Sequence, residues 1–203
     1  MKRFLSIFLI LTIFSGLVFA DAYDEGDEYD DGYVYETNGA GDQFFKFGIG
    51  TIIPVNFGGA VKQDGTYANG KLYTGGNINL GYYRFLNNWL AVGGEALITY
   101  NLSVGNKILV MLPVTFGAMA MPTVGNFEFP CFLTAGVSYE TWQNNHNFPS
   151  PAVNASAGVF YRFTESFSLG ATATMLYTLQ FVKGKNPENG LFTTANIALR
   201  YHF

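Results

Sequence analysis

The final thirteen residues, 191–203, constrain the fold of this chain more than any other segment. Every second residue from position 191, ending in Tyr201 and Phe203, is mostly apolar. The residues between them are mostly polar or small and include Arg200 and His202. Successive side chains of a β-strand point to opposite faces, so this alternation predicts a strand with one apolar and one polar face. A strand of this kind that ends on an aromatic residue is typical of the closing strand of a transmembrane β-barrel.

The first twenty residues have the pattern of a secretory signal peptide. Lys2 and Arg3 precede an apolar run over residues 4–19, and Ala20 offers a small residue for cleavage. A basic start, an apolar centre and a small residue at the cut are the features that signal peptidase requires. We therefore expect residues 1–20 to be removed on export. An uncleaved anchor is the alternative, although the run is shorter than the roughly 20 residues of a spanning helix.

Residues 21–43 form an acidic segment. It holds nine of the fifteen Asp and Glu residues and no Lys or Arg, whereas residues 44–203 have a formal net charge of +3. A segment with many charges of one sign and no periodic apolar residues cannot form a hydrophobic core. We therefore expect these residues to be a flexible tether. Cation binding by the clustered carboxylates is the sharper alternative, but the spacing of an EF-hand loop is missing.

Composition favours a membrane protein without spanning helices. Charged residues make up 13% of the chain and aromatic residues 17%, against about 25% charged residues in soluble domains. The best candidate for a helix after the signal segment, residues 108–125, contains Pro113 and Pro122 and several β-branched residues. A closed β-barrel is therefore the expected way to cross a membrane. The single cysteine, Cys131, excludes an intramolecular disulfide and falls on the apolar face of its strand.

Alternation and turn residues divide the rest of the chain into eight predicted strands, which make residues 44–203 an all-β, up-and-down antiparallel barrel. The predicted ranges are 44–53, 74–85, 89–100, 107–119, 127–140, 152–163, 167–181 and 191–203. The odd-numbered connections are mostly longer than the even-numbered ones. Barrels of the outer membrane have short periplasmic turns, so we expect both termini in the periplasm. Four external loops follow, at 54–73, 101–106, 141–151 and 182–190.

Aromatic residues gather near the strand ends, as in the two girdles of a membrane barrel. The predicted periplasmic girdle comprises Tyr83, Phe85, Trp89, Phe129, Tyr161, Phe163, Phe167, Tyr201 and Phe203. The predicted outer girdle comprises Tyr100, Tyr139, Trp142, Tyr177 and Phe181. One conflict arises, because Ile78, Leu80 and Tyr82 also share an outward face. A bulge near Gly81 would let Tyr83 and Phe85 face outward as well.

The signal segment, the eight strands and the terminal Tyr201-His202-Phe203 resemble the small outer-membrane barrels of diderm bacteria, the OmpA-barrel, OmpX and OmpW-like group. The resemblance implies a monomer in outer-membrane lipid, with Tyr201 and Phe203 as the signal read by the barrel-assembly machinery. It also implies one of two activities. OmpW-like members are thought to pass small hydrophobic molecules, and OmpX-like members act in adhesion and defence.

The inward face contains the candidate functional residues. The charged lumen candidates are Lys46, Glu95, Glu140, Arg162 and Arg200. An unpaired carboxylate at mid-strand would be costly, so Glu95 is expected to pair with Lys46, Arg162 or Arg200, or to contact trapped water. Eight strands enclose a lumen that side chains can fill. Glycines are nevertheless frequent at inward positions, among them Gly136 and Gly158, and we expect them to thin this filling.

Catalysis is not expected, and neither is a cofactor, a metal or a nucleic-acid partner. His146 is close in sequence to Ser150 in the third predicted loop, but a nucleophile and its base also need direct contact and an orienting group. His202 lies far from it, and two distant histidines make no metal site. We favour a narrow conduit for small molecules, with adhesion to an extracellular ligand through the external loops as the alternative. A purely structural barrel is the third interpretation.

Overall fold

The computed structural model describes residues 37–57, 72–103, 106–142, 146–181 and 188–203, and for His146 only the backbone. These residues belong to one compact unit, Tyr35–Phe203. The predicted signal peptide, and the acidic segment up to residue 36, lie outside the described residues. No helix in the described part of the chain is long and apolar enough to cross a membrane.

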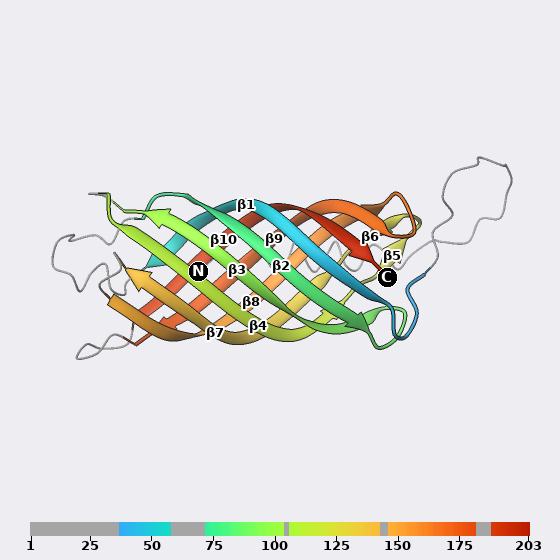
Figure 1. Cartoon of the computed structure of the whole chain (residues 1–203), viewed down its shortest axis with the longest axis horizontal. Coiled ribbons are helices and arrows are strands. Elements are labelled where there is room, and N and C mark those ends of the chain that lie inside the picture. The colour runs from blue at the N-terminus through green and yellow to red at the C-terminus, as the bar shows by residue number, and fades with distance from the viewer. Residues whose placement is uncertain (1–36, 58–71, 104–105, 143–145, 182–187) are drawn as a thin grey trace, which may run out of the picture. The chain divides into compact units, whose positions relative to one another are not determined.

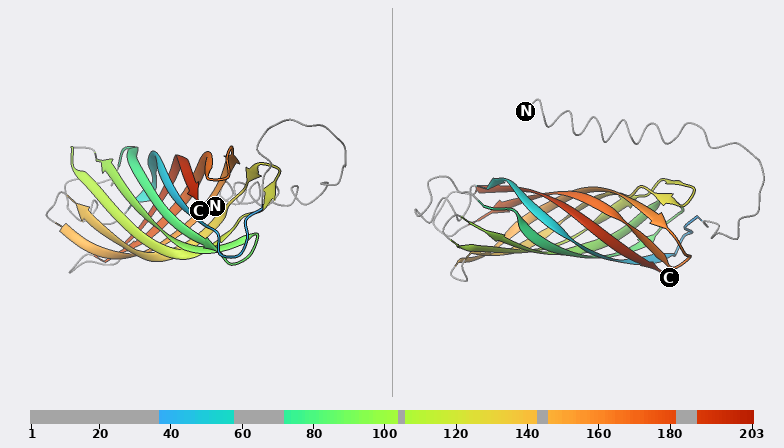
Figure 2. Two further views of the ribbon diagram at one scale, coloured as in Figure 1. Left: turned by 45° about the vertical axis from the view of Figure 1, so that its right-hand side comes forward. Right: turned by 90° about the horizontal axis from the view of Figure 1, so that it is seen from above.

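Eight long strands form a closed antiparallel barrel, in which the strands tilt strongly around the axis (Figure 1, Figure 2). They are β1 (Gln43–Phe57), β2 (Gly75–Phe85), β3 (Leu90–Leu102), β4 (Ile108–Ala120), β7 (Cys131–Trp142), β8 (His146–Arg162), β9 (Phe167–Gln180) and β10 (Glu188–His202). Each pairs with the next in this order, and the pairing of β1 with β10 completes the barrel. The predicted fold class is confirmed.

The two ends of the barrel differ. Here the terminal end is the one where β1 begins and β10 finishes, and the loop end is the opposite one. A short hairpin, β5 (Thr123–Val124) and β6 (Phe127–Glu128), lies at the terminal end (Figure 1). Its second strand pairs with β8. Gly125 turns this hairpin with φ +54°, a left-handed conformation that glycine adopts without steric penalty.

The hairpin corrects the predicted fifth strand, which was placed at 127–140. The long strand β7 begins only at Cys131, after the hairpin and Pro130. The predicted third external loop, 141–151, is also wrong, because β7 continues to Trp142 and β8 starts at His146. β8 contains two prolines near its start, Pro149 and Pro151. β8 pairs with β9 only from Ala152 onward, so at both prolines β8 has β7 as its one neighbouring strand. Proline lacks a backbone N–H to donate, and it is therefore tolerated at such a strand edge.

The outer face of the barrel is apolar around its whole circumference. Each of the eight long strands contributes exposed apolar side chains, among them Phe47, Tyr82, Ile98, Phe116, Leu133, Val159, Leu169 and Ile197. Cys131 is exposed on the same face, as predicted. Apolar patches of this extent mark contact with lipid rather than water. The sheet is therefore a transmembrane β-barrel.

Three aromatic residues assigned to the girdles lie inside the barrel instead. Tyr83 and Phe85 of β2 are buried, and so is Trp142 of β7. The register of β2 against both neighbours runs without a break, so the bulge expected near Gly81 is absent. Without a bulge the alternation places Tyr82 outside and Tyr83 inside. The other residues of both girdles are exposed, apart from Phe129, which is half-buried.

The inward glycines have a different role from the predicted thinning of the lumen. A Cβ atom added to Gly136 would lie 2.1 Å from the carbonyl oxygen of Val114 on β4. The same holds for Gly50, Gly93, Gly117 and Gly170, where a Cβ atom would lie 2.0–2.1 Å from a carbonyl oxygen of a neighbouring strand. These glycines thus mark points where backbones approach closely as the sheet bends. Such glycine positions allow a sheet to curve into a small barrel.

Candidate functional site: the barrel interior

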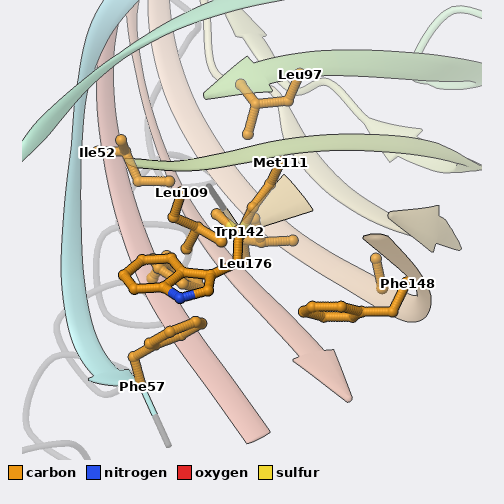
Figure 3. Packing of buried hydrophobic residues seen from close by; sticks show 10 residues of the cluster. Ile52, Phe57, Leu97, Leu109, Met111, Trp142, Phe148 and Leu176 are labelled. Atoms are coloured by element: carbon orange, nitrogen blue, oxygen red, sulfur yellow. The ribbon is translucent and has the colours of Figure 1, made fainter. Parts of the chain in front are cut away.

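An apolar cluster fills the interior at the loop end (Figure 3). Trp142 is its largest member, and it is packed with Phe57, Phe192 and Leu109, none of which is more than 5% exposed. The rings of Phe57 and Phe192 lie 5.6 Å apart. The remaining members are Ile52, Leu97, Met111, Phe148, Ala152 and Leu176. We refer to these ten residues as the loop-end cluster.

A second cluster fills the terminal end and consists of Phe44, Tyr83, Phe85, Ala91, Met119, Met121 and Phe132. We refer to it as the terminal cluster. The rings of Phe44 and Tyr83 stack at 5.4 Å, and the rings of Tyr83 and Phe132 are 5.1 Å apart. The misplaced girdle residues of β2 therefore form the centre of this cluster. Aromatic pairs at these distances contribute beyond the area that they bury.

Lys46 and Glu95, from β1 and β3, form an ion pair within the barrel. Both side chains are 2% exposed. Asn79 Nδ2 donates a hydrogen bond of 3.2 Å to the other carboxylate oxygen, and Lys46 Nζ lies 4.7 Å from the centroid of the Phe132 ring. The pairing expected for Glu95 is thus present, with Lys46 as the base. It joins the ionic part of the interior to the terminal cluster.

Arg200 of β10 is completely buried between aromatic rings. Its guanidinium carbon lies 3.4 Å from the centroid of Phe160 and 4.7 Å from that of Phe44. Nη1 donates to Glu128 Oε2 at 3.0 Å, and Arg162 Nη1 lies 3.6 Å from Glu128 Oε1. A planar guanidinium can stack and donate at the same time, which a lysine ammonium cannot do.

Glu128 was missing from the sequence-based candidates, although it joins two of them. It belongs to β6, so the short hairpin carries this carboxylate into the terminal end of the barrel, where it is fully buried. Arg162 also donates to Asn38 Oδ1 at 3.0 Å and to the Glu165 carbonyl at 2.7 Å. The turn residues between Pro122 and Gly125 were the one signal in the sequence for this hairpin.

Hydroxyl and amide groups occupy the middle of the barrel. Thr115 lies midway along β4 between Met111 of the loop-end cluster and Met119 of the terminal cluster. Its Oγ1 accepts hydrogen bonds from Thr134 at 3.0 Å and from Asn154 at 3.1 Å. Hydroxyl and amide groups thus lie between the two apolar clusters.

Glu140 of β7 is the fifth predicted lumen residue, and it lies apart from the others near the loop end. Its side chain is fully buried, and Gln180 Nε2 donates to its Oε2. No ion pair joins it to a base in the described ranges, in contrast to Glu95 and Glu128. The structure therefore groups Lys46 with Glu95, and Arg162 with Arg200, but leaves Glu140 with neutral neighbours.

The predicted assembly residues Tyr201 and Phe203 lie on the outer face, 46% and 59% exposed. Their rings stack at 5.7 Å, and Phe167 of β9 lies 5.2 Å from Tyr201. The Phe203 N–H donates to the Gln43 carbonyl at 3.0 Å, which ties the end of the chain to the start of β1. Both aromatic side chains thus remain accessible to lipid or to another protein.

Ser150 and His202, two of the residues considered for catalysis, lie at opposite ends of the barrel. Ser150 is buried in β8 near the loop end, and His202 lies at the terminal end with its Nε2 3.0 Å from the Ser168 hydroxyl. The side chain of His146 is outside the described set. Among the described residues, no three His, Cys, Asp or Glu side chains are grouped so that they could hold a metal ion.

Comparison with known proteins places the chain in a family. A protein-family model that carries no functional description matches residues 25–201. The chain belongs to this family. A protein of Treponema pallidum, described as uncharacterised, is 28% identical over 179 residues, which cover 84% of this chain and 81% of that protein. An uncharacterised protein of Borreliella burgdorferi is 27% identical over 132 residues, which cover 54% of this chain and 62% of that protein.

Solved structures confirm the resemblance to small eight-stranded outer-membrane barrels. Neisserial surface protein A has a TM-score of 0.61 and 10% identity, over 81% of this chain and 98% of that protein. The outer membrane protein OprG from Pseudomonas aeruginosa has a TM-score of 0.52 and 15% identity, over 81% of this chain and 97% of that protein. At these identities the similarity establishes the fold.

Proposed function

We propose that this protein is a non-conducting barrel of the bacterial outer membrane, which serves as an anchor for contacts made at its loop end with an anionic partner outside the cell. The observation that carries this proposal is the filled interior. Trp142, Phe192, Arg200 and Tyr83 all stand inside the barrel with at most 1% of their surface exposed. Interiors packed in this way leave few voids larger than a water molecule.

This proposal favours surface interaction over the conduit that the sequence analysis preferred. The conduit hypothesis depended on glycines that would thin the lumen. At Gly136 and four similar positions the missing side chain is explained by close backbone approach instead. In addition, apolar clusters occupy both ends of the barrel, and a solute would have to displace one at entry and the other at exit.

In the proposed orientation both termini face the periplasm and the loop end faces outward. The turns at the terminal end that join β2 to β3 and β8 to β9 are short, which is the pattern of periplasmic turns. Tyr201 and Phe203 would then present the assembly signal from the periplasmic side. We also propose that the barrel is a monomer, because pairing of β1 with β10 leaves no open strand edge.

The sequence of the loop-end connections supports an anionic partner. The connections 58–71 and 182–187 lie outside the described residues. They contain Lys62, Lys71, Lys183 and Lys185, with Asp64 as their one acidic residue. An excess of bases over acids attracts polyanions over roughly 8–10 Å at physiological ionic strength. Tyrosine, asparagine and glycine in the same connections suit adaptable contacts.

Retention of an anionic polymer by proteoliposomes tests the proposal. Liposomes carrying the refolded mature protein are expected to bind dextran sulfate, and the binding should weaken as salt is added. Replacement of the four loop lysines by glutamine should lower retention at least about tenfold, because several charge contacts are lost together.

Arg84→Gln is the matched control, since Arg84 is an exposed base at the terminal end of β2. In right-side-out liposomes its retention should equal that of the wild type. If the quadruple variant binds as well as the wild type, or if the wild type binds neutral dextran equally, the proposed partner class is wrong.

A further inference from the structure

Glu140 lies at the centre of a group of polar side chains on three adjacent strands. Ser150 of β8 and Thr178 of β9 flank its carboxylate, and Gln180 donates to it. Register supports this grouping, because Ser138 pairs with Ser150, and Thr178 pairs with Ala152, two residues beyond Ser150.

Hydrogen bonding around the carboxylate is incomplete, although the Ser150 and Thr178 hydroxyls lie within reach of it. Within the described residues, no hydrogen bond within geometric limits reaches the following buried atoms: Ser138 Oγ, Glu140 Oε1, Ser150 Oγ, Thr178 Oγ1 and Gln180 Oε1. All five side chains are 0% exposed. One buried polar atom without a partner costs about 1–3 kcal/mol. The Ser150 and Thr178 hydroxyls can donate to the carboxylate, which leaves Ser138 Oγ and Gln180 Oε1 without a described partner. Carboxylate and hydroxyl oxygens grouped at one place are ligands of the kind that a hard cation takes.

The charge of the group also requires a partner. The other two acids buried within the barrel, Glu95 and Glu128, each contact a base. Glu140 has neutral neighbours. A bare carboxylate in a membrane-spanning structure is costly and marks a functional site by default. Lys107, a described base at this end, has its Nζ 6.0 Å from the Trp142 ring centroid.

We propose that Glu140 and its four neighbours bind a small monovalent cation, with sodium as the probe. A single carboxylate neutralises one positive charge, whereas a divalent ion would leave a net charge buried in the barrel. Hydroxyl oxygens and the Gln180 carbonyl oxygen supply the neutral ligands. The site goes beyond the proposed function and does not depend on it.

The position of the site gives it a structural consequence. Trp142 lies two residues beyond Glu140 on the same inward face of β7 and is the largest member of the loop-end cluster. An ion that joins β7, β8 and β9 beside this cluster would hold the strands in place around it. Cation binding is therefore expected to stabilise the folded barrel, since a ligand that binds only the folded state shifts the folding equilibrium.

The test measures urea unfolding of the refolded mature protein in detergent micelles, in sodium chloride and in choline chloride of equal ionic strength. In a Trp89→Phe background, the fluorescence of Trp142 reports the loop end. At a sodium concentration about ten times the dissociation constant, the unfolding equilibrium constant should fall about tenfold relative to choline. Glu140→Gln, which keeps the shape of the side chain, should remove this difference.

Glu165→Gln is the matched control, because Glu165 is an exposed acid in the turn between β8 and β9, at the terminal end of the barrel. It should retain the full difference between sodium and choline. Thr178→Val is the second variant and should reduce the difference even if Glu140→Gln folds poorly. Equal stability of the wild type in the two salts overturns the proposal, as does a sodium effect that persists in both Glu140→Gln and Thr178→Val.

Discussion

Gly136→Val is expected to prevent the barrel from closing. Even the first carbon of a side chain at this position would lie 2.1 Å from the Val114 carbonyl oxygen and 2.8 Å from the Thr115 Cα. Both are backbone atoms of β4, so a rotamer change cannot relieve the contact. β4 and β7 would have to separate and give up interstrand hydrogen bonds. We expect a loss of at least about 4 kcal/mol, the range reached only by severe core and backbone changes.

The measurement is the yield of folded protein, followed by the heat-dependent shift in gel mobility and by urea unfolding. Ala135→Val is the matched control, since Ala135 is the neighbouring residue on the exposed face of β7. It should fold with wild-type yield. If Gly136→Val folds as well as this control, the close approach of β4 and β7 is not present in the protein.

Lys46→Met is expected to destabilise the barrel by about 3–5 kcal/mol, because it leaves the Glu95 carboxylate buried without its cation. Methionine keeps most of the volume of lysine and can still contact Phe132, so loss of packing contributes little. The quantity to measure is the free energy of unfolding in urea, with the wild type and the variant refolded in the same micelles.

The double variant Lys46→Met/Glu95→Gln separates the charge from the packing. It removes both charges and leaves a carbonyl oxygen that can accept from Asn79, so at least half of the lost stability should return. If the double variant is less stable than Lys46→Met alone, the cost of the single substitution does not come from an unpaired carboxylate.

Alternation along the chain was sufficient to predict the eight long strands and the faces of most residues. In a membrane barrel one face meets lipid and the other the interior, so the two-residue period persists along each strand. This is why Lys46, Glu95, Glu140, Arg162 and Arg200 could all be placed inside from the sequence. The sequence left three bases as possible partners of Glu95. Only the relative positions of β1 and β3 in the folded barrel identify Lys46 as the partner.

Aromatic residues near strand ends were misread because two different environments use the same residue types. Tyr83 and Phe85 close the interior, whereas Tyr82 on the same strand faces outward. We expected aromatic residues at strand ends to face lipid and therefore set aside the two-residue alternation of β2. The alternation alone would have placed Tyr83 and Phe85 inside, where they are. The short hairpin that carries Glu128 was missed for another reason. Its strands have two residues each, too few to show any period.

Glycine was misread because a sequence shows only that a side chain is missing. Inward glycines are compatible with an open lumen and equally with a tightly bent sheet. Distances to the neighbouring strand decide between these, and at Gly136 they indicate bending. The preference for a conduit depended on this choice, which no property of the sequence could make.

Ion conductance of the refolded mature protein in a planar lipid bilayer tests the central claim most directly. The claim is that the loop-end and terminal clusters close the barrel at both ends. In concentrated potassium chloride we expect no discrete current steps. The protein must first be shown to be folded by its gel-mobility shift, and a known channel-forming barrel must give current steps under the same conditions. Stable unitary currents that recur in independent preparations would contradict the closed interior and restore the conduit as the function.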